Sequence, residues 1–174
     1  MDFEEKTISS REIFQGRIVK LRVDTVVLPD SRQSTREVVE HAGAVAIIAL
    51  DEKGDIIMVR QYRKPVEEVL LEIPAGTLEA NEDPLLCAQR ELQEETGFTA
   101  NHWEKILSYY SAPGFSNERL HLYLASGLSE GEGHTDDDEF IEVVRLTLQD
   151  AYQLIFDGRI QDGKSIIGIQ YACR

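Results

Sequence analysis

The first forty residues carry the alternating hydrophobic and polar pattern of β-strands. Between residues 6 and 29, apolar side chains alternate with polar ones and β-branched residues are frequent, and both features are typical of strands. A turn-forming cluster, Pro29-Asp30-Ser31, separates this stretch from another short strand predicted over residues 35–41. The pattern therefore predicts a small antiparallel sheet, which needs another surface to pack against because of its size.

The middle of the chain begins with a continuous apolar run, residues 43–50 (GAVAIIAL), of the kind that forms a fully buried strand. A charged turn leads from it into a strand over residues 56–60, so the two are predicted to form a hairpin. Residues 129–140 are polar and acidic and are predicted to form a loop. The other periodic segments predict strands over residues 69–74, 103–110, 119–125 and 141–146, and C-terminal helices over residues 150–156 and 164–172.

A helical period runs through the segment before Gly97, where apolar residues recur at spacings of three and four: Leu85, Leu86, Ala88 and Leu92. Asp83 and Pro84 are residues that favour the start of a helix, and a glycine favours its end. We therefore expect a helix from about Asp83 to about Thr96. Cys87 lies on the apolar side of this helix.

The same helix carries three glutamates, Glu91, Glu94 and Glu95, at positions i, i+3 and i+4. This spacing places the three carboxylates on one face, where they repel one another. A solvated acidic face is one interpretation of such a cluster. The other is a cation site, because oxygen ligands at close quarters suit a hard divalent ion such as Mg²⁺, which also shares substrate phosphates.

The residues around these glutamates favour the cation site. Counting from Gly76, the chain carries at matching spacings Glu82, Arg90-Glu91-Leu92, Glu94-Glu95 and Gly97-Phe98. This pattern resembles the Nudix box at every position. The resemblance implies a loop–helix–loop in which the three glutamates hold metal ions and the carbonyl of Ala75 is a further ligand. It gives Glu82 and Arg90 a structural role, with Arg90 restraining the acidic cluster by a charge-assisted bond.

Composition narrows the class of protein. With 174 residues and 42% hydrophobic content, the chain suits one domain with a proper core and a small accessory segment. The formal net charge of −14 argues against nucleic-acid binding, which depends on Lys and Arg. Two cysteines do not make a disulfide framework, and both are expected to be reduced. The N-terminus is acidic and lacks an apolar segment, so we expect a cytoplasmic protein without a membrane anchor.

Features outside the box resemble the ADP-ribose pyrophosphatase branch of the Nudix hydrolases. They are a proline-glycine loop at Pro113, the N-terminal strands, the pair Arg36-Glu37 and the sequence Gln61-Tyr62-Arg63. The resemblance implies an α/β (α+β) fold, with a Nudix-type α/β/α sandwich and a mixed sheet over residues 42–174. It also implies that residues 1–41 form an antiparallel β-region that is exchanged between the subunits of a homodimer and completes an active site shared by the two subunits.

The same resemblance implies which residues bind the substrate. Arg63 would contact the diphosphate, since its planar fork matches phosphate oxygens, although this basic strand end can also be interpreted as merely solvated. Arg36 and Glu37 would help hold the adenosine or ribose end of the substrate, either in the same chain or from the partner subunit. Gly114 and Glu118, from the proline-glycine loop, complete the set of expected substrate-binding residues.

The implied reaction is hydrolysis of the pyrophosphate bond of ADP-ribose to AMP and ribose 5-phosphate. Two or three Mg²⁺ ions, with Mn²⁺ as an alternative, would bind the diphosphate, and Glu94 would serve catalysis as one of their ligands. The catalytic base would come from the acidic loop. The loop offers Asp137, Asp138 and Glu139, of which Glu139 is favoured and Asp137 is the next. Relatives often have glutamate where this chain has aspartate at 137, whose reach is shorter.

Three other functions compete with this one. A Nudix hydrolase of another nucleotide sugar, a dinucleoside polyphosphate or NADH would keep the same metal helix and differ in its pocket. A non-catalytic ADP-ribose sensor is disfavoured because such domains tend to lose box glutamates, which are all present here. A Ca²⁺ buffer is disfavoured because the chain lacks the D-x-D-x-D-G-x₅-E loop.

Overall fold

The structure is a computed structural model that describes residues 3–131 and 140–174. The chain forms two compact units. The first unit consists of Met1–Gly43 and Tyr109–Leu120, and the second unit consists of Ala44–Ser108 and His121–Arg174. The contiguous division between residues 41 and 42 stays a prediction. None of the helices in the described residues has the length and apolar character needed to cross a membrane.

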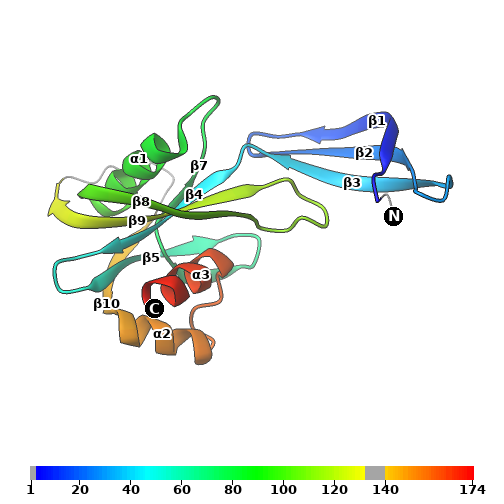
Figure 1. Cartoon of the computed structure of the whole chain (residues 1–174). Helices are drawn as coiled ribbons and strands as arrows, with labels where there is room; N and C mark the ends of the chain where they lie inside the picture. The colour runs from blue at the N-terminus through cyan, green and yellow to red at the C-terminus, as the bar shows by residue number, and fades with distance from the viewer. Residues whose placement is uncertain (1–2, 132–139) are drawn as a thin grey trace. The chain divides into compact units, whose positions relative to one another are not determined.

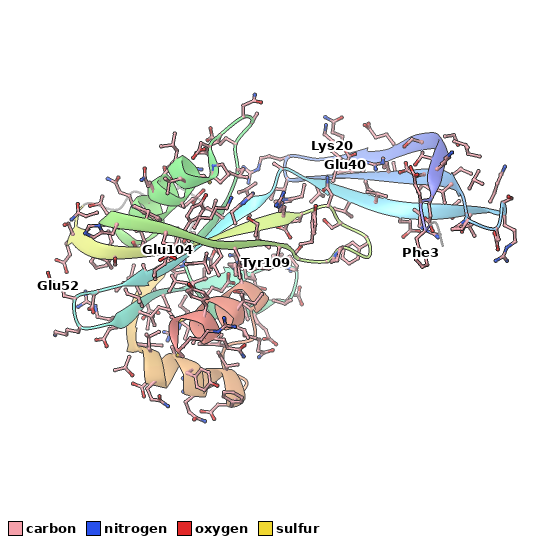
Figure 2. The ribbon with its side chains drawn as sticks, viewed as in Figure 1. Phe3, Lys20, Glu40, Glu52, Glu104 and Tyr109 are labelled. Atoms are coloured by element: carbon pink, nitrogen blue, oxygen red, sulfur yellow. The ribbon has the colours of Figure 1, made fainter. Side chains whose placement is uncertain are left out.

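The first unit is built on a three-stranded antiparallel sheet in the order β1 (Lys6–Gln15), β2 (Val19–Val27) and β3 (Gln33–His41). This confirms the predicted N-terminal antiparallel region. Lys20 of β2 lies opposite Glu40 of β3, as Figure 2 shows. Every residue of the edge strand β1 is exposed.

The loop over residues 111–118 belongs to the same unit and lies along β3. The backbone N–H of Val39 donates to the carbonyl of Phe115 at 2.8 Å, and the N–H of Asn117 donates to the carbonyl of Val39 at 3.2 Å. The side chain of Asn117 also accepts from the N–H of His41 at 2.8 Å. These bonds pair the outer edge of β3 with a segment that is distant in sequence.

The second unit contains a seven-stranded sheet in the order β10-β5-β4-β9-β8, with β6 beside β5 and β7 beside β4. Figure 1 shows this sheet at the centre of the unit. The last residues of β8 and the first residues of β9 belong to the first unit. The strands are β4 (Ala44–Leu50), β5 (Asp55–Arg63), β6 (Glu68–Glu72), β7 (Ala75–Thr77), β8 (Phe98–Tyr110), β9 (Arg119–Glu130) and β10 (Glu142–Thr147).

Helices cover both faces of this sheet, as Figure 1 shows for α1 (Pro84–Thr96), α2 (Leu148–Phe156) and α3 (Gly163–Ala172). Strand β4 is apolar at successive positions because its side chains point to both faces. Its residues Val45, Ile47 and Ala49 share a buried cluster with α1, whereas Ile48 lies against Gly168 of α3. The predicted α/β/α sandwich is therefore confirmed.

Helix α1 has the predicted bounds. Asp83 is its N-cap and accepts from the N–H of Leu85 at 2.9 Å, and Gly97 ends it with a φ of 74°, which glycine adopts without strain. Burial raises the pKa of the Cys87 thiol to about 12, so Cys87 stays protonated and serves as part of the apolar core. Leu86, one of the residues that gave the helical period, is exposed instead.

Several strands differ from their predicted bounds, most clearly β9, which runs from Arg119 to Glu130 rather than to residue 125. Strand β7 has three residues, too few to show a pattern, and forms because it pairs with β4. Strand β8 begins at Phe98 rather than at residue 103. Its residues Thr99, Asn101 and His102 are polar and exposed, and pairing with β9 identifies this segment as part of the strand.

Candidate active site

The backbone that precedes α1 is fixed by a glutamate of that helix. The N–H of Ala75 donates to Oε2 of Glu95 at 3.0 Å, and Glu95 is buried, with 7% of its surface exposed. On the other side, the N–H of Ile47 donates to the carbonyl of Pro74 at 2.9 Å. The segment that carries the Ala75 carbonyl is therefore held between β4 and the last turn of α1.

Gly76 allows a second glutamate of α1 to approach the backbone. A Cβ atom at Gly76 would overlap the carboxyl group of Glu91, so the position is open only to glycine while that carboxylate keeps its place. Strand pairing with β4, through Val45, fixes the backbone of Gly76 itself. Glu91 thus sits in a hollow that the missing side chain creates.

Arg90 gathers the acidic residues of this region. Its Nη1 donates to Glu91 Oε1 and to Glu94 Oε2, both at 2.8 Å, while Nε and Nη2 donate to the two carboxylate oxygens of Glu82 at 3.0 and 3.1 Å. These bonds hold the pKa of the Glu82 carboxyl at about 2 and raise the pKa of the Arg90 guanidinium. The prediction that Arg90 restrains the cluster is confirmed. One cation therefore offsets part of the repulsion that the spacing of the glutamates creates.

The donor set fits a hard divalent cation. The carboxylates of Glu91, Glu94 and Glu95 come from the second half of α1, and the N–H of Ala75 bonds Glu95. The missing side chain at Gly76 lets the Glu91 carboxyl lie against the same backbone segment. In residues 3–131 and 140–174, no three Asp, Glu, His or Cys side chains converge into a ready-made metal centre. Arg90 is one reason for this, because its Nη1 bonds carboxylate oxygens of Glu91 and Glu94 that would otherwise be available to a metal ion. The ligand set stays a prediction.

The predicted diphosphate contact, Arg63, lies at the end of β5 and is not simply solvated. Its Nε and Nη2 donate to the two carboxylate oxygens of Glu72, both at 2.8 Å. Hydrogen bonding to Glu72 raises the pKa of Arg63, and the charge of Glu95 adds to this effect. The guanidinium is thus held on one edge, while 39% of its side chain stays exposed.

Three of the predicted substrate-binding residues come together in the first unit. Arg36 and Glu37 of β3 and Gly114 of the loop line one pocket of about 380 Å³, a size suited to a small ligand. Arg36 donates to both carboxylate oxygens of Glu5, at 2.8 and 2.5 Å. Glu118 does not line this pocket; it accepts from the hydroxyl of Ser111 at 2.5 Å.

The predicted catalytic bases, Glu139 and Asp137, lie outside the described residues, so both assignments stay predictions. Sequence reasoning missed Glu5, Glu72 and Lys164, the residues that hold Arg36 and Arg63. The one available signal was Glu72, a carboxylate in an otherwise apolar strand segment (VLLEIP), because a buried charge requires a partner.

Comparison with known proteins gave matches along nearly the whole chain. A profile of the NUDIX domain matches residues 40–166, and one described as the nucleoside diphosphate sugar hydrolase N-terminal domain matches residues 5–39. The chain is 51% identical to the methanol dehydrogenase activator of Bacillus methanolicus and 48% identical to an ADP-ribose pyrophosphatase of Bacillus subtilis strain 168. Both alignments cover 97% of this chain and 92% of the relative.

More distant relatives extend the same pattern. An ADP-ribose pyrophosphatase of Mycobacterium tuberculosis is 42% identical over 97% of this chain and 82% of its own length. A solved structure described as an ADP compounds hydrolase superposes with a TM-score of 0.87, covering 100% of this chain and 95% of the other. Its sequence identity is 19%, so this last similarity concerns the fold alone.

Proposed function

The chain belongs to the NUDIX domain family, and on this premise we propose that it is an enzyme that hydrolyses ADP-ribose to AMP and ribose 5-phosphate. The observation that carries the proposal is the complete box in its folded form, with Glu91, Glu94 and Glu82 gathered around Arg90. Pyrophosphatase relatives at 42 and 48% identity support the choice of substrate. The reaction adds water across the bridge between the phosphorus atoms: a new phosphorus–oxygen bond forms and a bridging one breaks.

Residues of this chain divide the work as follows in the proposal. The groups that would hold two or three Mg²⁺ ions, with Mn²⁺ as an alternative, are the side chains of Glu91, Glu94 and Glu95 and the Ala75 carbonyl. When bound, the metal would neutralise charge at the diphosphate and activate water for the attack. Arg63 presents its exposed edge to a phosphate oxygen. The chain has a net charge of −14, and the site contains several glutamates. Both repel a diphosphate, so the diphosphate is expected to bind only when cations are present.

The pocket of the first unit binds the nucleoside end of the substrate in this proposal. Arg36 is fixed by Glu5 on one edge of its guanidinium, and its backbone neighbours Glu37 and Val38 line the same pocket as Gly114. Because Glu5 holds the Arg36 guanidinium in place before the ligand arrives, less conformational entropy is lost on binding. A hydroxyl-rich ribose suits a pocket with charged donors and acceptors on one wall.

The nearest alternative is an enzyme that hydrolyses the pyrophosphate bond of a nucleotide sugar instead of ADP-ribose. Relatives named GDP-mannose pyrophosphatase, from Yersinia enterocolitica and Yersinia pestis, are 36 and 35% identical over 82% of this chain. Their identity is lower and their coverage shorter than those of the ADP-ribose pyrophosphatases. A nucleotide sugar is therefore the second candidate, and it must be included in any substrate test.

We expect ADP-ribose to be cleaved faster than any other compound of a panel containing GDP-mannose, diadenosine polyphosphates and NADH. The products, AMP and ribose 5-phosphate, are separated by chromatography. EDTA should abolish the activity, and excess Mg²⁺ should restore it, because the metal carries most of the charge neutralisation. GDP-mannose cleaved faster than ADP-ribose would contradict the substrate, and full activity in EDTA would contradict the metal dependence.

We also propose that the protein is a homodimer. The edge strand β1 is exposed along its whole length and carries apolar residues at Ile8, Ile13 and Phe14. An exposed strand edge with apolar side chains is a surface that a second chain can cover. Sedimentation should give twice the mass of the 19.7 kDa chain, and Ile13→Glu should shift the equilibrium towards the monomer. An active wild-type monomer at assay concentration would overturn the dimer and the shared site.

A further inference from the structure

A buried cluster of charges lies outside the box and is not explained by metal binding. Its centre is Glu72, the last residue of β6, whose side chain is only 2% exposed. Burial alone would raise the pKa of this carboxyl, but Arg63 and Lys164 outweigh that effect and hold the pKa below its ordinary value. Glu72 is thus an ionised carboxylate inside the protein, and it depends on both cations for that state.

The bonds of Arg63 leave one edge of its guanidinium available. A guanidinium has five N–H donors, and the described residues accept from two of them, Nε–H and one Nη2–H, both through Glu72. A bidentate bond of this kind fixes the plane of the guanidinium as well as its position. The orientation of the other edge therefore follows from the position of the Glu72 carboxylate.

Lys164 fixes that carboxylate from the other side. Its Nζ bonds Oε2 of Glu72, the oxygen that also accepts from Arg63, and lies 3.1 Å from Oδ1 of Asp162. Lys164 is itself mostly buried, with 12% of its side chain exposed. Two cations and two carboxylates are therefore gathered at the start of α3, and their charges balance.

The start of α3 also holds the backbone that follows Glu72. Asp162, the N-cap of α3, accepts from the backbone N–H and the hydroxyl of Ser165 at 3.0 and 2.5 Å. The same Ser165 hydroxyl accepts from the N–H of Ile73 at 2.8 Å. One helix start thus contacts both Glu72 and the strand end that leads to Ala75, so Glu72 is held by groups other than Arg63 as well.

We propose that Lys164, acting through Glu72, is a positioning residue that orients Arg63 towards the diphosphate of the substrate. The inference rests on the proposed function, because it needs a diphosphate for the exposed edge of Arg63. Without Lys164, Arg63 has to balance the charges of both Glu72 and Asp162. Its guanidinium is then drawn inwards, and the edge that faces the substrate is lost.

A purely structural role for Lys164 makes a different prediction. If the cluster only joined β6 to α3, removal of Lys164 would lower the stability of the protein, by an amount that depends on Arg63 because both cations bond Glu72. It would also leave ligand affinity unchanged in the molecules that stay folded. The two roles can therefore be separated by a double-mutant cycle between Lys164 and Arg63 that measures affinity.

The experiment measures the affinity of an ADP-ribose analogue with a methylene bridge between its phosphorus atoms, by calorimetry with Mg²⁺ present. Lys164→Met should weaken binding about tenfold in the wild-type background, comparable to the loss of a residue that orients a ligand-binding group. In the Arg63→Ala background it should weaken binding less than twofold. Lys164→Arg, which keeps the charge, should bind within about threefold of wild type.

Lys105→Met provides the matched control, because it removes the same charge from an exposed position of the same unit; its affinity should equal that of wild type. Equal effects of Lys164→Met in both backgrounds, or an unchanged affinity with only a lower Tm, would overturn the proposal. The analogue is not hydrolysed, so its affinity can be measured whether or not the protein cleaves ADP-ribose. A wild type that binds the analogue but does not cleave ADP-ribose would refute the proposed reaction, and the double-mutant cycle would still test the role of Lys164. A wild type that does not bind it overturns both.

Discussion

Replacing Glu94 by Gln is expected to lower kcat for ADP-ribose hydrolysis at least about 100-fold and to leave the fold intact. Such a loss corresponds to about 2.7 kcal/mol of transition-state stabilisation. Glu94 is 41% exposed and bonds only one cation of the box, Arg90. The amide keeps the size of the side chain and leaves no buried charge unpaired, but a neutral oxygen is a weaker ligand for Mg²⁺.

The assay compares kcat over a range of Mg²⁺ concentrations and follows thermal unfolding by circular dichroism. Glu104→Gln is the control, because Glu104 is an exposed glutamate on β8 outside the box, labelled in Figure 2; it should retain wild-type turnover. We expect Glu94→Gln to unfold within a few degrees of wild type, since exposed substitutions change stability by less than about 0.5 kcal/mol. Near-normal turnover of Glu94→Gln with an unchanged Mg²⁺ dependence would exclude Glu94 as a metal ligand.

Gly76→Ala should have an effect of similar size for a different reason. The added methyl group would overlap the carboxyl of Glu91, so that side chain must leave the hollow beside the backbone. Gly76 does not have a positive φ, and alanine therefore strains the backbone itself very little. The change acts on the position of one carboxylate, and a displacement of about 1 Å at a catalytic group can cost about 100-fold in rate.

Gly163→Ala is the matched control, since a Cβ at that position meets no atom within 4 Å. The expected result for Gly76→Ala is a large fall in kcat and a higher Mg²⁺ requirement, with a Tm close to that of the control. Gly76→Ala with wild-type kcat and wild-type Mg²⁺ dependence would show that the position of Glu91 does not matter to the reaction. A folded variant that binds neither Mg²⁺ nor substrate agrees with the assignment.

The parts of the fold that sequence predicted correctly are those in which local pattern and final environment agree. The helical period and its flanking residues gave α1 with Asp83 and Gly97 at its ends, and the apolar run gave β4, because a strand covered on both faces has no polar side. Strand β7 was not predicted, because its three residues form a strand only by pairing with β4. Local pattern contains no information about such a partner.

The candidate site divides in the same way. The restraining role of Arg90 followed from the resemblance to the Nudix box, and it could be predicted because the bonds of Arg90 to Glu91 and Glu94 lie within one helix. The partner of Arg63 could not be predicted, because Glu72 is held by Lys164, 92 residues further along the chain. Arg36 likewise depends on Glu5, 31 residues before it. Which side chain neutralises a given charge is decided by tertiary packing, and a single sequence does not contain that pairing explicitly.

The pairing of β3 with the loop over residues 111–118 has a consequence for synthesis on the ribosome. Strand β3 emerges early, but Asn117, which bonds to His41, is made 76 residues later. At about 5–20 residues per second, the outer edge of β3 stays unpaired for about 4–15 s. During that interval a nascent chain exposes an edge that neighbouring chains on the same messenger can extend. Slow translation of this stretch should therefore favour misassembly, and a chaperone that covers β3 should suppress it.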